Sequence, residues 1–198
     1  MENKFASTLR SRKPKALNIC QSANKPTNFT VNLAVDLLID TDANNYYILY
    51  ANILFNGTAD QTITTNSGTI SGGTWTVDKT SGTVLAGSLN LYLPNLTITA
   101  GTVDFSDATN ATLSRSFTQS SGAFTAPTGT MTVKTGFTRT GGTFNANGGT
   151  VLFYLGVSYG TSYTIIPDGA IFNNVINDGP HGCLLYTSDA ADELRYID

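Results

Sequence analysis

The residues best suited to chemistry are two aspartates and an arginine near the middle of the chain. Asp104 and Asp107 are three residues apart, and Arg115 follows eight residues after the second aspartate. Paired carboxylates can hold a divalent cation or divide acid and base roles, and an arginine can stabilise developing negative charge. However, residues 106–110 also have the composition of an ordinary polar turn. The sequence leaves both interpretations open and favours the turn.

Other residues suited to catalysis or metal binding are scarce. His181 is the only histidine, so the body of the chain lacks the residue needed for a histidine-activated nucleophile or a histidine-containing zinc site. Asp40 and Asp42 open a segment similar to a calcium loop, but Asn45 and Ala51 stand where that loop needs glycine and glutamate. A turn in which these aspartates bond their own backbone fits better. We therefore predict a protein that is not an enzyme, with no catalytic, cofactor-binding or metal-binding residue.

Aromatic side chains are the remaining candidates for a binding surface. If exposed, they could stack against sugar rings, but aromatic residues in strands more often belong to the core, and we expect that here. The candidates are Trp75, Tyr46, Tyr47, Tyr50, Tyr154 and Tyr159.

Charge is scarce and unevenly distributed. Charged residues make up 13% of the 198 residues, and the net charge is -3. Residues 1–25 hold six of the 11 basic residues, whereas residues 26–182 hold four basic residues against nine aspartates. Such an acidic body is unsuited to nucleic acid backbones, so we expect no nucleic-acid partner. No run of eighteen apolar residues occurs, which predicts that no transmembrane helix is present.

A repeated pattern between Ser116 and Phe153 determines the predicted fold. At an offset of 20 residues, the second half of this stretch matches the first at two phenylalanines, a glycine and an alanine. The matched pairs are Phe117 with Phe137, Gly122 with Gly142, Phe124 with Phe144, and Ala126 with Ala146. A fixed period of this length indicates a solenoid in which each repeat is one coil. We predict an all-β parallel β-helix with coils of about 20 residues.

The same repeat predicts which side chains point inward. Glycine permits the chain to turn a corner with positive φ, and the residues that follow alternate between the two faces of a strand. The four paired phenylalanines are expected to form internal ladders, and the threonines between them are expected to face outward.

The chain divides into three predicted segments. Residues 1–26 are a basic leader expected to be disordered, residues 27–182 are the β-solenoid, and residues 183–198 differ in composition from both. Residues 183–193 resemble the translation of a sequencing adapter, which implies a non-native tail on a metagenomic fragment. Cys20 and Cys183 lie in the two least regular segments, so a disulfide between them is not expected.

The repeats also resemble a known class of proteins. The motif Phe-Thr-x-Ser/Thr-x-Gly-x-Phe-x-Ala-x-x-Gly-Thr, followed by Gly149–Phe153 and Ile171–Asn177, is similar to the degenerate repeats of large bacterial surface proteins. Those are adhesin-like chains with parallel β-helix passenger regions. The resemblance implies a structural or adhesive segment of a longer exported protein, located outside the cell or on its surface. It implies contact with extracellular glycans or with host or neighbouring-cell surfaces, and it provides no catalytic residue.

One enzymatic alternative uses the same fold. Polysaccharide lyases and glycoside hydrolases also occur on parallel β-helices, and the lyases place acidic calcium ligands and a basic side chain on one outer face. Asp104 follows the inward Val103, so it is expected to point outward as such a site requires. Asp104, Asp107 and Arg115 are therefore the residues on which this alternative depends.

Overall fold

The computed structural model describes residues 17–19, 28–33, 37–39, 50–65, 73–154 and 164–178. Over these ranges the chain forms strands and turns, and no helix long and apolar enough to cross a membrane occurs among them. The first nine strands are β1 (Leu17–Ile19), β2 (Asn28–Leu33), β3 (Leu37–Ile39), β4 (Tyr50–Phe55), β5 (Gln61–Thr65), β6 (Thr74–Ala86), β7 (Asn90–Leu93), β8 (Asn95–Asp104) and β9 (Asn110–Leu113). The remaining strands are β10 (Ser116–Gln119), β11 (Ala123–Thr125), β12 (Thr130–Val133), β13 (Gly136–Arg139), β14 (Thr143–Asn145), β15 (Thr150–Phe153), β16 (Ile165–Ile166) and β17 (Asn174–Asn177).

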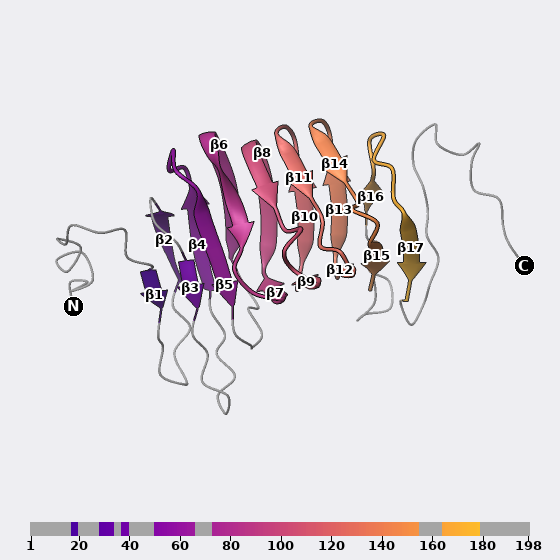
Figure 1. Ribbon diagram of the computed structural model, residues 1–198, viewed down its shortest axis with the longest axis horizontal. Coiled ribbons are helices and arrows are strands. Elements are labelled where there is room, and N and C mark those ends of the chain that lie inside the picture. Colours follow the sequence, from indigo (N-terminus) through magenta and orange to yellow (C-terminus); the bar gives the residue numbers. More distant parts are fainter. Residues whose placement is uncertain are drawn as a thin grey trace, which may run out of the picture.

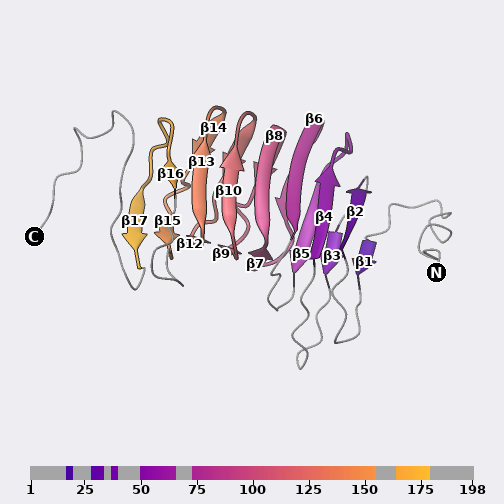
Figure 2. The same cartoon turned by 180° about the vertical axis from the view of Figure 1, so that it is seen from behind.

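The strands stack in parallel as a β-solenoid, which confirms the predicted fold class. Strands inside the stack pair with the strand one coil earlier and the strand one coil later, so the sheets run along the long axis of the molecule (Figure 1). The solenoid has about five turns. The same stack of strands is visible from the opposite side, with β17 at one end and β1 at the other (Figure 2).

Each regular coil contains three strands, which produce three ladders. The first ladder contains β4, the first part of β6, the first part of β8, β10, β13 and β16. The second contains β5, the later parts of β6 and β8, β11 and β14. The third contains β7, β9, β12, β15 and β17. Because β6 and β8 each continue around the corner between the first two ladders, these ladders belong to one twelve-stranded sheet.

The register places like residues above like residues, as the repeat predicted. Phe117 pairs with Phe137, and Phe124 pairs with Phe144. Their rings stack with centroid distances of 4.9 Å and 5.5 Å, respectively. Aromatic pairs at such distances contribute about 0.5–1.5 kcal/mol beyond the area that they bury. The predicted internal phenylalanine ladders are therefore confirmed, although the ring of Phe144 is only partly buried.

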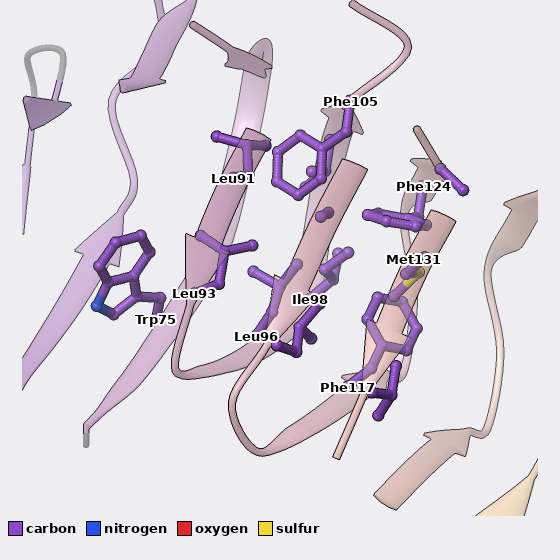
Figure 3. Close-up of a cluster of buried hydrophobic side chains, with 14 of the residues drawn as sticks. Trp75, Leu91, Leu93, Leu96, Ile98, Phe105, Phe117, Phe124 and Met131 are labelled. Carbon is purple, nitrogen blue, oxygen red and sulfur yellow. The ribbon is translucent and has the colours of Figure 1, made fainter. Parts of the chain in front are cut away.

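The core is the apolar interior enclosed by the three ladders. Alternate residues of each strand are buried, and the pattern buried–intermediate repeats through β5, β7, β9, β10, β12, β13 and β15. Figure 3 shows part of this interior, where Trp75, Leu93, Leu96 and Phe117 lie between the strands. This two-residue alternation of a pleated strand directs every second side chain inward, and the stacked coils join these side chains into one continuous core.

Glycines make the corner between the first and second ladders. Gly101, Gly122 and Gly142 all have positive φ. A Cβ on Gly122 would lie 2.3 Å from the carbonyl oxygen of Gly101, and one on Gly142 would lie 2.5 Å from that of Gly122. Glycine is required at this corner both for the backbone conformation and for the close approach of successive coils.

The predicted end segments fall largely outside the described residues. Of residues 1–26, the structure describes only β1, which pairs with β3. Residues 179–198 lie outside the described ranges, and so do His181, Cys20 and Cys183. The predictions made for these residues therefore stay predictions.

Candidate functional site

The most regular outer feature is a column of threonines on the first ladder. Strand pairing aligns Thr76 with Thr97, Thr97 with Thr118, and Thr118 with Thr138. We call these four residues the threonine column. Adjacent members are one strand spacing apart, about 4.8 Å.

The threonine column faces outward because its members alternate with core residues. In β10, for example, Phe117 and Gln119 are buried while Thr118 between them is partly exposed. Each threonine presents one methyl group and one hydroxyl group, and its neighbours in the column shield it in part. The column therefore combines a small apolar surface with hydrogen-bonding groups at a fixed interval.

The position two residues earlier in each strand is also uncharged. Thr74 pairs with Asn95, and Ser116 pairs with Gly136. The Asn95 side chain links its neighbours: its Oδ1 accepts from the hydroxyl of Ser116 at 2.8 Å, and its Nδ2 donates to the Gly73 carbonyl at 2.8 Å. These contacts fix polar groups beside the threonine column without adding a charge.

The third ladder has a different outer surface. Its partly exposed column contains Tyr92, Thr112, Thr132, Leu152 and the exposed Ile176. At the beginning of the same strands, Asn110 donates from Nδ2 to Asn90 Oδ1 at 2.9 Å and accepts from the backbone N–H of Thr130 at 3.1 Å. This face mixes hydroxyl, aromatic and aliphatic side chains, so it does not repeat one chemical group as the threonine column does.

The carboxylates and arginine of the enzymatic alternative lie at different corners of one coil. Asp104 ends β8 with its neighbours in register at Leu85 and Thr125, and its Oδ1 accepts from the backbone N–H of Ser106 at 2.9 Å. Asp107 follows in the same corner, and Arg115 lies beyond the four-residue β9. At about 3.3 Å per residue, that strand alone spans about 13 Å. Asp104 therefore serves a local turn, and the structure does not bring Arg115 to it.

The remaining candidates from the sequence are the aromatic residues and the two aspartates of the calcium-like loop. Trp75 is completely buried in the core, and its indole Nε1 has no hydrogen-bond partner. Tyr154 is 39% exposed, so the prediction that it belongs to the core is wrong. Of the remaining tyrosine candidates, Tyr46, Tyr47 and Tyr159 lie outside the described residues, as do Asp40 and Asp42; the side chain of Tyr50 is likewise not described. Within the described ranges, no group of three or more His, Cys, Asp or Glu side chains is arranged to hold a metal ion.

Sequence reasoning missed a set of polar side chains inside the solenoid. Lys79 and Arg139 are each 2% exposed, and Gln119 is fully buried. A signal was present for all three, because each follows an inward residue by two positions: Lys79 follows Val77, Gln119 follows Phe117, and Arg139 follows Phe137. Burial lowers the pKa of Lys79 below its ordinary value, and the nearby Asp60 carboxylate opposes this change. Burial likewise lowers the pKa of Arg139, against the opposing charge of Asp168.

Comparison with known proteins identified no similar protein. A scan against protein-family models and searches of the curated proteins and of the solved structures found no match to this chain. The β-solenoid fold and the side chains on its outer faces therefore carry the functional argument.

Proposed function

We propose that this chain is a structural and adhesive segment of an exported bacterial surface protein, without enzymatic activity of its own. The observation that carries the proposal is the threonine column, which repeats one hydroxyl and one methyl group along the solenoid axis. A single contact to one threonine contributes little to the binding free energy. Repeated at a fixed spacing, such contacts can act together on a partner that also repeats.

The charge of this surface favours neutral partners. The threonine column and the aligned positions Thr74, Asn95, Ser116 and Gly136 contain no ionisable side chain, and the exposed Asp78, two residues after Thr76, adds one negative charge beside them. A neutral polysaccharide surface offers hydroxyl groups and apolar ring faces without requiring a counter-charge. We therefore expect binding to insoluble neutral glycans such as cellulose or chitin, with little dependence on ionic strength.

A sedimentation assay with matched variants tests the adhesive role. Thr97→Lys combined with Thr118→Lys places two charges at the centre of the threonine column, where binding to a neutral surface would have to desolvate them. We expect the affinity to fall at least about tenfold. The control, Thr112→Lys with Thr132→Lys, makes the same change on the third ladder and should leave binding unchanged.

Three results would contradict the proposal. Absence of wild-type binding across a panel of neutral glycans would remove the adhesive role, and equal effects of the two double variants would remove the assignment to the threonine column. Cleavage of an acidic polysaccharide, lost in Asp104→Ala, would establish the enzymatic alternative instead. The surface location is tested separately, by antibody labelling of intact cells of the source organism.

A further inference from the structure

The interior cations occupy the places where the regular repeat changes. The length of a corner can be counted from the outward threonine of the first ladder to the core-facing residue at the centre of the second ladder. This count is six residues in three successive coils: Thr97 to Val103, Thr118 to Phe124, and Thr138 to Phe144. The equivalent corner is eight residues long in the preceding coil, from Thr76 to Val84. Lys79 lies in this longest corner. Arg139 ends β13 in the last of the three regular coils, and β13 pairs with the shortened strand β16 of the next coil.

Arg139 reaches forward to the next coil. Its Nη1 donates to the carbonyl oxygens of Pro167 and Asp168 at 2.8 Å and 3.0 Å. Its Nε donates to Gln119 Oε1 at 2.9 Å, and its Nη2 donates to Gly142 at 2.8 Å and, more weakly, to Gly141 at 3.4 Å. All five N–H groups of the guanidinium therefore have acceptors. One side chain joins three successive coils.

Lys79 reaches in the opposite direction. Its Nζ donates to the carbonyl oxygens of Gly57 and Ala59 and to Gln61 Oε1, the last two at 2.9 Å and 2.6 Å. All three acceptors belong to the preceding coil. The two buried cations thus hold the coils on either side of the regular centre, one toward each end of the described solenoid.

The coil held by Arg139 has few other attachments. We call residues 165–177 the terminal coil. β16 pairs over only two residues, and a single bridge joins Ile171 to Asn145. The Asn173 side chain donates to the Gly148 carbonyl at 2.8 Å, and the four residues of β17, all exposed, pair with β15. Ile171 is 83% exposed. Two apolar side chains anchor it: Ile165, which is buried in the core, and Phe172, whose ring contacts Phe137, Phe144 and Phe153 of the preceding coils.

We propose that Arg139 is a latch that holds the terminal coil on the solenoid, and that this coil opens as a unit when the latch is removed. Buried hydrogen bonds from a charged donor contribute more than neutral ones, and here they connect the coil at the corner where pairing is shortest. Opening uncovers the edges of β13, β14 and β15, which then present unpaired backbone groups. This inference concerns the fold alone and does not depend on what the threonine column binds.

Residue-resolved hydrogen exchange tests the latch. In Arg139→Met, which keeps an unbranched apolar stem but removes every donor, amide protection in the terminal coil should fall roughly tenfold to hundredfold. Protection in β8, β9 and β10 should change much less. Arg139→Lys retains a charge that reaches fewer carbonyls and should give an intermediate loss; it also serves if Arg139→Met fails to fold.

Two controls make the outcome decisive. Lys134→Met removes a partly exposed cation five residues before Arg139 in the chain and should leave the terminal coil protected. Lys79→Met should reduce protection around Gly57–Gln61 and not in the terminal coil. An equal loss of protection in every coil of the Arg139 variants, or an unchanged terminal coil, would overturn the latch.

Discussion

Replacing Gly122 by alanine tests the contact between successive coils. Gly122 has φ +73°, and its added Cβ would lie 2.3 Å from the Gly101 carbonyl oxygen. The left-handed conformation costs a non-glycine residue about 1–2 kcal/mol. The obstructing atom belongs to the backbone and cannot rotate away, so overpacking adds about 1–3 kcal/mol. We expect Gly122→Ala to lower the free energy of unfolding by about 2–5 kcal/mol.

Gly148 provides a matched control for this variant. Its φ is +74°, but nothing lies within 4 Å of an added Cβ. Gly148→Ala should therefore cost only the conformational part, about 1–2 kcal/mol. Urea unfolding followed by circular dichroism measures both, provided that the slope of the free energy against urea stays the same. Equal losses in the two variants would refute the reasoning, because the coil contact would then contribute nothing.

Three further predictions concern the core, the buried lysine and the outer polar contacts. Phe124→Ala should lower the free energy of unfolding by about 3–5 kcal/mol, whereas Thr125→Ala beside it should change it by no more than about 0.5 kcal/mol, as measured by urea unfolding. Because burial lowers the folded-state pKa of Lys79 below 10.5, the unfolded state binds more protons between those two values, and stability should rise as the pH increases through that window. Urea unfolding measured across this pH range should show that the free energy of unfolding rises with pH in the wild type and rises less in Lys79→Met. An identical rise in both proteins would refute the assignment of this pH dependence to Lys79. Asn110→Ala removes two side-chain hydrogen bonds, one to Asn90 Oδ1 and one from the Thr130 backbone N–H, and should lower the free energy of unfolding by about 1–2 kcal/mol, read from the urea midpoint.

The repeat in the sequence was sufficient to predict the coil and its register. An offset of 20 residues aligned Phe117 with Phe137 and Phe124 with Phe144, and strand pairing joins those same residues. The physical reason is that a parallel ladder fixes residue against residue, so a periodic sequence becomes a column in space. Alternation along each strand then determined which side chains are buried.

The enzymatic site was the part that spacing could not decide. Asp104, Asp107 and Arg115 are close in sequence, but β9 lies between the second aspartate and the arginine. An extended strand separates its ends more than any other local structure does, so proximity along the chain does not predict proximity across a coil. The side chain of Asp104 is used by its own turn.

The sequence by itself determined the coil period, the inward phenylalanines and the outward threonines, because each depends on local alternation and on a repeated length. Tertiary structure decided what the inward Lys79 and Arg139 contact. Their acceptors in neighbouring coils lie 18 to 29 residues away in sequence: four backbone carbonyls and the side-chain oxygens of Gln61 and Gln119. Which carbonyls lie within reach depends on the length of each corner, which differs between the coil of Lys79 and the coil of Arg139. A buried charge must find such acceptors, and only the stacked coils bring them within reach.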